Sequence, residues 1–367
     1  MDLAMTDLLT GPVTAGGGLA VYGAAALDRP DPAGTLTALA AAGTPGRLAD
    51  IPRRSRELLP QVAELCDELA DLGRVVLVGA GAAALAPAAM ARTVGRPLTV
   101  VDDTDPGRIG AALGGPLERT VVVVSAESGS ASETDSRCRA CLRALLDSGR
   151  SAAEAGRHLV VVTAPDSPAA KAAAGTGAFV VPADPRPGGP FSALTAYGLV
   201  PAALAGVAVV ELLDQAQELA GTLTGERDNP ALALGGALGT AAALGRDRVL
   251  LRGDGTGLDG LGDWIARLLA GATGGAGLGI RPTVVEPTDH PGPAGPDTVA
   301  VSYGGALRAG DVPGGGTGPD LAVNGPLGAQ FLAWEYAAAV AAGVLGVDPF
   351  QDPFHQPDDA DPTGPPD

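Results

Sequence analysis

Val121 to Thr134 reads VVVVSAESGSASET, and this stretch decides the class of fold. Four β-branched residues make a strand that is apolar on both faces, and the small residues after it open a helix. Such a loop presents backbone N–H groups and hydroxyls, which suit a phosphate. Glu127 lies inside the loop, however, and a carboxylate a few ångströms from a phosphate repels it. The stretch therefore predicts an α/β protein and leaves the purpose of the loop open.

Similar apolar runs flank this stretch and alternate with segments of helical composition. The runs that read as strands are 74–79, 98–102, 120–125, 158–163 and 178–182. Strands that are apolar on both faces and separated by helices indicate a parallel sheet covered on both sides. The first half of the chain is therefore predicted to be a doubly wound α/β domain.

A second α/β segment follows a long apolar stretch at 191–219. It contains strand-like runs at 248–253, 283–287 and 298–303, and a last helix at 328–346. The stretch 304–325 is too rich in Gly and Pro for a packed element, and the wider stretch 287–326 leaves room for few strands and helices, so we expect a second sheet that is reduced. The predicted division is an irregular N-terminal arm with one or two short helices over 1–50, a first domain over 51–220, a reduced second domain with the C-terminal helix over 221–346, and an acidic disordered tail over 347–367.

Composition and charge exclude several classes of partner. The chain has 367 residues and a formal net charge of -18, which disfavours contact with nucleic acid or an anionic membrane surface. The N-terminus carries no signal-like basic and apolar regions, and no apolar run is long enough to span a membrane. We therefore expect a cytoplasmic protein. With aromatics at only 3%, its core must be built from Ala, Val and Leu.

Cysteines and histidines give little sign of chemistry. Cys138 and Cys141 spell CxxC within a predicted helix, where packing is favoured over a redox or metal role. His158 begins a predicted strand and is expected to be structural, whereas His290 and His355 lie in Pro-rich segments. We predict no metal site and no catalytic histidine.

A glycine-rich turn, GAGAAAL at 79–85, follows the first strand of the first domain and opens a helix. The spacing departs from GxGxxG because position 84 is alanine, although Asp102 ends a strand about 20 residues on. A nicotinamide site is therefore a minor alternative, and we predict no cofactor.

Several segments together resemble the actinobacterial type of glucose-6-phosphate isomerase, a family built from two sugar-isomerase (SIS) domains. The resemblance runs from about Ile51 to Pro353 and is carried by GAGAAALAPAAMART, LTVVDDTDP, SAESGSASETDS, GGPFSALTAYGLVPAALAG, DWIARLLAGATGGAGLGIRP and LGAQFLAWEYAAAVAAGVLGVDPFQ. It implies two SIS-type parallel sheets, a sugar-phosphate ligand and a homodimer. By the same resemblance, the ligand-binding residues would be Gly79, Gly81, Ser128, Gly129, Ser130 and Thr134.

This chain departs from the family where the chemistry would be. The resemblance assigns a proton-transferring glutamate, an enediolate-stabilising arginine and a ring-opening lysine to the positions of Gly271, Pro190 and Asp359. Glycine supplies no titratable group, and proline has no side-chain donor for a developing oxyanion. We therefore predict no catalytic residues.

The binding loops are also altered. Hydroxyls that the family carries after the first strand are replaced by Ala82, Ala83 and Ala84, and a lysine of the phosphate loop is replaced by Glu127. Ser130 and Glu133 fit an S-x-x-E capping box, so the loop serves either helix initiation or a weakened ligand site. The leading hypothesis is a non-catalytic isomerase-like protein that binds a sugar or metabolite or another protein. The alternative is an active isomerase, or another sugar-modifying enzyme, with relocated groups.

Overall fold

The structure, a computed structural model, describes most of the chain. The described ranges are 13–24, 44–102, 105–125, 131–184, 190–225, 227–274, 279–285, 295–305 and 319–350. Most of the predicted acidic tail, 351–367, lies outside them.

Five parallel strands form the first sheet in the described part of the chain, in the order β4-β3-β5-β6-β7. Their bounds are β3 (Arg74–Val78), β4 (Thr99–Val101), β5 (Thr120–Ser125), β6 (Leu159–Thr163) and β7 (Phe179–Pro182). All six residues of β5 are buried, as expected for a central strand covered on both faces. The expected doubly wound domain is confirmed.

Seven helices of the described residues cover the first sheet. They are α6 (Leu59–Glu68), α7 (Ala82–Thr93), α8 (Pro106–Ala112), α9 (Ala131–Asp147), α10 (Ala152–Arg157), α11 (Pro168–Ala174) and α12 (Ala196–Leu204). Alternate β5 residues face opposite layers, because side chains alternate along a strand. Val121 and Val123 pack with α6, α7 and α12, and Val122 and Val124 pack with α8 to α11.

The second sheet has six strands among the described residues, in the order β1-β2-β11-β10-β8-β9. Their bounds are β1 (Val13–Gly16), β2 (Leu19–Tyr22), β8 (Arg248–Gly253), β9 (Arg281–Val285), β10 (Thr298–Gly304) and β11 (Leu321–Asn324). β11, β10, β8 and β9 are mutually parallel, and β2 pairs antiparallel with β11. The parallel part is thus one strand smaller than in the first sheet.

Two expectations about this sheet were wrong. The segment 1–50 was expected to be an irregular arm, but β1 and β2 form a hairpin on the second sheet. Gly17 and Gly18 both have positive φ, which suits the tight turn of a two-residue hairpin. The stretch 304–325 was expected to hold no packed element, but Leu321–Asn324 is a fully buried strand. Neighbouring strands on both sides satisfy its backbone, so the Gly/Pro-rich context does not prevent pairing.

Helices of the second half surround α16 (Leu327–Val344), which is buried over most of its length. They are α13 (Val209–Ala220), α14 (Pro230–Ala243) and α15 (Leu261–Thr273). Small residues permit this close packing: a methyl group on Gly235 would lie 2.5 Å from the Ala337 carbonyl oxygen. A helix that is apolar on all sides is a central core helix.

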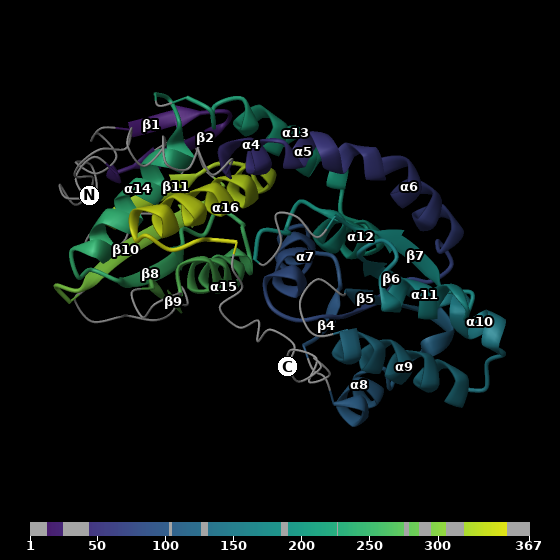
Figure 1. Cartoon of the computed structure of the whole chain (residues 1–367). Helices are drawn as coiled ribbons and strands as arrows, with labels where there is room; N and C mark the ends of the chain where they lie inside the picture. Colours follow the sequence, from purple (N-terminus) through teal and green to yellow (C-terminus); the bar gives the residue numbers. More distant parts are fainter. Residues whose placement is uncertain are drawn as a thin grey trace, which may run out of the picture.

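Figure 1 shows the two sheets in separate lobes, each with its own helices. The short helices α4 (Thr44–Ala49) and α5 (Ile51–Ser55) lie beside α13, and α5 continues through a 3₁₀ turn into α6 (Figure 1). The chain thus passes from the hairpin of the second sheet into the first sheet and then returns. None of the helices in the described ranges is long and apolar enough to cross a membrane.

Candidate functional site

The strand order of the first sheet locates the candidate site. The chain passes from β3 to β4 on one side of β3, and then to β5 on its other side. Ligands of open α/β sheets bind at the carboxyl ends of the strands, at such a switch in direction. The turn after β3 contains Gly79 and Gly81, two of the residues predicted to bind ligand.

Gly79 and Gly81 are glycines for different physical reasons. A methyl group on Gly79 would lie 3.2 Å from Ser125 Cβ, so the end of β5 approaches the backbone closely. Gly81 precedes α7 with φ 67° and ψ -150°, a conformation that side-chain-bearing residues rarely adopt. The structure thus brings this turn against the end of β5.

The other predicted ligand residues are placed only in part. Thr134 is buried, with 5% of its surface exposed, near the start of α9. Ser128, Gly129 and Ser130 lie outside the described residues, as does the side chain of Glu133. The choice between a capping box and a ligand loop therefore stays a prediction.

The first turn of α7 is buried but carries no cap. Ala82, Ala83 and Ala84 are at most 6% exposed, and no side chain caps the helix at Gly81. Among the described residues, no backbone carbonyl accepts from the amides of Ala82 and Ala83. The start of a helix has partial positive charge and free N–H groups, so this turn is suited to an anionic or hydroxyl-bearing ligand.

Ser125 adds a hydroxyl at the same place. It ends β5 on the side of the sheet that Val121 and Val123 share, which is the side covered by α7. Its side chain is 4% exposed, and its Oγ has no hydrogen-bond partner in the described part of the protein. A buried hydroxyl without a partner is uncommon and invites a ligand or water.

One face of α15 brings the second half of the chain to this site. Asp263, Arg267 and Gly271 recur every four residues and therefore share that face. Asp263 Oδ2 lies 3.7 Å from Arg92 Nη1 of α7. A methyl group on Gly81 would lie 3.7 Å from Arg267 Nε, and the sequence alone did not single out this arginine.

Gly271 and Pro190 meet at the end of the same face. A methyl group on Gly271 would lie 3.4 Å from Pro190 Cγ, an ordinary van der Waals contact. These are the positions to which the family resemblance assigned the proton-transferring glutamate and the enediolate arginine. Neither residue carries a titratable or charged side chain.

Glu335 is a second residue that sequence reasoning missed. It lies on α16 with 0% of its surface exposed, and its Oε1 accepts a hydrogen bond from the Ala193 amide at 3.0 Å. Its Oε2 has no partner among the described residues. Burial raises the pKa of this carboxyl to about 8, against the opposing effect of the Ala193 hydrogen bond. Glu335 is therefore largely a neutral acid near pH 7, and the residue it contacts, Ala193, follows shortly after Pro190 in the chain.

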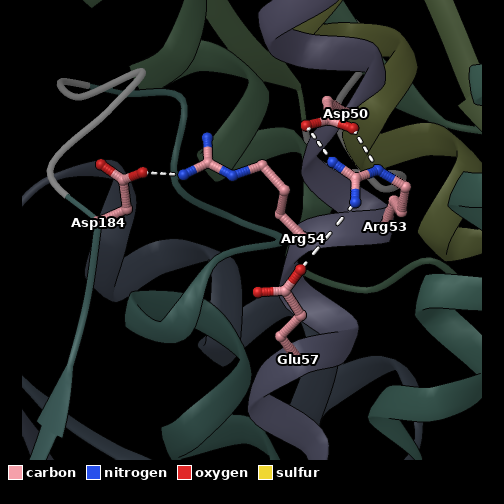
Figure 2. Close-up of polar contacts among 5 residues, drawn as sticks. All are labelled: Asp50, Arg53, Arg54, Glu57 and Asp184. Carbon is pink, nitrogen blue, oxygen red and sulfur yellow. Dashed lines mark hydrogen bonds and ion pairs between the residues drawn. The ribbon is translucent and has the colours of Figure 1, made fainter.

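Two arginines of α5 pair with different acidic residues (Figure 2). Arg53 binds Asp50 through Nε at 2.6 Å and Nη2 at 2.8 Å, and this pair lowers the pKa of Asp50. Arg54 instead reaches Asp184, which follows β7 and leads toward Pro190 (Figure 2). Both pairs are exposed, so each adds little to stability. The Arg54–Asp184 pair nevertheless links the end of β7 to α5.

The cysteines and His158 match their expected structural roles. Burial raises the pKa of Cys138 to about 11 and raises that of Cys141 as well, which disfavours the reactive thiolates. His158 is buried, and its Nδ1 lies 2.7 Å from the Thr120 carbonyl oxygen. His290 and His355 lie outside the described residues. Within the described ranges, no group of three His, Cys, Asp or Glu residues could hold a metal.

A hollow also lies at the opposite edge of the first sheet. It measures about 550 Å³ and lies at the amino ends of β5 and β6, beside Arg150, Glu154 and Arg157. Arg157 is already bonded to Asp71, and Glu154 completes the cap of α10 with Ser151. Because these charges are already engaged within the protein, we place the candidate site at the carboxyl edge of the sheet.

Comparisons with known proteins agree on one group. No protein-family model matches the chain. It is 31% identical over 227 residues to the glucose-6-phosphate isomerase of Carboxydothermus hydrogenoformans, covering 54% of this chain and 46% of that one. It is 34% identical over 171 residues to that of Thermosynechococcus vestitus, covering 44% and 32%. The chain thus spans about half the length of these relatives or less.

Solved structures extend the likeness to the fold as a whole. A glucose-6-phosphate isomerase from Chlamydia trachomatis has a TM-score of 0.71 at 17% identity, covering 96% of this chain and 90% of that one. A hypothetical protein from Thermus thermophilus has the same TM-score at 22% identity, covering 88% and 91%. Two largely parallel sheets with a glycine turn at the switch point define a phosphosugar isomerase-type SIS fold. The fold and the sequence relatives thus both point to similarity with glucose-6-phosphate isomerase-like SIS proteins.

Proposed function

We propose that this chain binds a sugar or sugar derivative between α7 and α15 without interconverting aldose and ketose. The observation that supports this most directly is that Gly271 and Pro190 adjoin, since a methyl group on Gly271 would lie 3.4 Å from Pro190 Cγ. Proton transfer requires a titratable group within reach of the substrate, and neither residue supplies one. The uncapped turn of α7 and the Ser125 hydroxyl supply donors for binding. A homodimer, implied by the family resemblance, is part of the proposal.

An active isomerase is the competing function. The sequence relatives favour it, because they are named glucose-6-phosphate isomerases. Activity would require an acid or base brought from elsewhere. Glu335 is unsuited, since it is fully buried behind the Ala193 amide and reaches no open surface. We therefore favour binding without turnover.

Filling the space above α7 tests where the ligand binds. Gly81→Leu would place a side chain beside Arg267 and over the uncapped turn, so we expect it to abolish binding of glucose and glucose 6-phosphate. Titration calorimetry on the purified chain measures this. Gly95→Leu is a matched control, because Gly95 has the same φ of 67° but no atom within 4 Å of the added carbon. Both variants therefore place a side chain at a positive φ, and circular dichroism checks that each of them folds.

The two variants separate the site from a general loss of folding. If Gly95→Leu and the unaltered chain bind while Gly81→Leu does not, the site is located. If the unaltered chain binds neither sugar at millimolar concentration, the binding function proposed here is wrong.

A further inference from the structure

A short irregular segment, 191–195, joins the candidate site to the core of the second half. It begins directly after Pro190, whose Cγ would lie 3.4 Å from a methyl group on Gly271. Residues 191–194 are at most 1% exposed, although they form no helix or strand. Buried backbone groups outside regular structure need partners from side chains. The partners of segment 191–195 therefore determine where Pro190 lies.

Two buried side chains from distant elements supply these partners. Glu335 of α16 accepts a hydrogen bond from the Ala193 amide through Oε1 at 3.0 Å. Ser55 of α5 donates to the Leu194 carbonyl oxygen at 2.6 Å. Segment 191–195 is thus held between α16 and α5, which gives Glu335 a structural reason to be buried.

The surroundings of Glu335 offer no charge to balance an ionised carboxylate in the described part of the chain. The helices packed most closely against α16 are α4, α13, α14 and α15. α14 and segment 191–195 contain no ionisable residue, and Tyr336 of α16 donates its hydroxyl to the Leu223 carbonyl oxygen. The charged residues of the other three helices are all exposed: Arg47, Glu211, Asp214, Glu218, Asp263 and Arg267. None of them contributes to the raised pKa of Glu335, whose causes are burial and the opposing Ala193 hydrogen bond.

Moving segment 191–195 away from Glu335 would release a proton to solvent. In the closed arrangement burial raises the pKa of Glu335 to about 8, against an ordinary value of 4.5 for a carboxyl in water. Opening lets water reach Oε2, which has no partner among the described residues when the contact is closed. The closed arrangement is therefore fully stabilised below pH 4.5, and its equilibrium constant falls about 10-fold per pH unit until about pH 8.

We propose that Glu335 is a positioning residue whose bound proton keeps segment 191–195 in place on α16, and that raising the pH releases the segment and with it Pro190. An irregular segment opens more readily than the helices around it, because fewer backbone hydrogen bonds hold it. Release of Pro190 then weakens sugar binding between α7 and α15, since Pro190 adjoins Gly271 of α15. This last step rests on the proposed function, whereas the movement itself does not.

Hydrogen exchange followed by mass spectrometry tests the movement on the full chain. Glu335→Gln keeps an oxygen for the Ala193 amide but cannot ionise, and comparison at the same pH cancels the intrinsic pH dependence of exchange. For a peptide covering 191–199, the ratio of the unaltered rate to the variant rate should rise about 10-fold per pH unit between pH 5 and pH 8 and then level off. Ser55→Ala is the matched control, because it removes the other hydrogen bond to the segment and should speed exchange equally at every pH.

Calorimetry with glucose tests the effect on the site. Glucose is uncharged at these pH values, so its own titration does not contribute. Its affinity for the unaltered chain should fall at least about threefold from pH 7 to pH 9, because only the closed fraction of the protein binds. Glu335→Gln should keep its affinity over the same range.

The outcomes separate this inference from the proposed function. A rate ratio that does not change with pH overturns the release of the segment, as does an equal acceleration of peptides from β5, which would show unfolding of the whole chain. An unchanged glucose affinity beside faster exchange of the segment overturns its effect on the site. Failure of glucose to bind at any pH counts against the proposed function, and the exchange rates then decide the role of Glu335 by themselves.

Discussion

Isomerisation of glucose 6-phosphate by the purified chain should be at least about 10⁴-fold slower than by an ordinary relative. General acid–base groups and oxyanion donors each contribute about 100-fold or more. By the family resemblance, Gly271 and Pro190 stand at the positions of one group of each kind, and neither has a titratable or charged side chain. A coupled assay that follows fructose 6-phosphate converted back to glucose 6-phosphate, run beside the Carboxydothermus enzyme, measures the difference.

The control for this assay restores the missing groups. Gly271→Glu with Pro190→Arg should be made together, because the two positions adjoin and each would restore one of the missing groups; a methyl group on Gly271 would lie 3.4 Å from Pro190 Cγ. We expect better binding of 6-phosphogluconate by the double variant and little turnover, since proton transfer needs several groups positioned to within about 0.5 Å. Turnover by the unaltered chain within about tenfold of the relative would contradict a non-catalytic role.

Replacing Glu335 should make the protein more stable in alkaline solution. Its folded-state pKa, about 8, lies above the ordinary value of 4.5, so the folded protein holds a proton that the unfolded chain releases. Stability is therefore fully present below pH 4.5 and falls as the pH rises toward 8. Glu335→Gln keeps an oxygen to accept the Ala193 amide but cannot ionise. At pH 9 we expect it to raise the free energy of unfolding by several kcal/mol, at about 1.4 kcal/mol per pKa unit.

Denaturant unfolding at pH 5, 7 and 9 measures this effect. At pH 5 the two proteins should differ little, because the glutamic acid is then mostly protonated in the folded state. Glu211→Gln on α13 is the control, since Glu211 is exposed and its replacement should not alter the pH dependence. Parallel pH profiles for Glu335→Gln and the unaltered chain would show that Glu335 is not buried as a neutral acid.

The first sheet could be predicted from sequence because each strand is a short, continuous apolar run between helices. Runs such as 120–125 and 74–79 indicate buried parallel strands on their own. The strand β11 could not be predicted, because its four residues lie in a Gly/Pro-rich stretch and carry too weak a local pattern. It is a strand because it pairs with β10 and β2. The hairpin of β1 and β2 did carry a sequence signal, because Gly17-Gly18 lies between two short apolar segments. Two consecutive glycines are a preferred two-residue hairpin turn.

The candidate site was predictable only where it follows from local sequence. Gly79 and Gly81 stand at a strand–helix junction, and that position is readable from pattern alone. Arg267 lies far along the chain from Gly81, and the two meet through the packing of α15 on α7. Glu335 is similar, because nothing in WEYAAA indicates whether the glutamate faces water or the core. Its burial results from the helices that enclose α16 on all sides.

The pairing of β2 with β11 also determines the order in which the chain can assemble. Tyr22 pairs with Ala322, so the hairpin must wait for roughly 300 further residues to be synthesised. At about 5–20 residues per second, that interval lasts on the order of 15 to 60 seconds. The first sheet is complete at Pro182 and can form during this time. The hairpin is thus synthesised long before β11, and the apolar strand β2 lacks its partner strand throughout that interval.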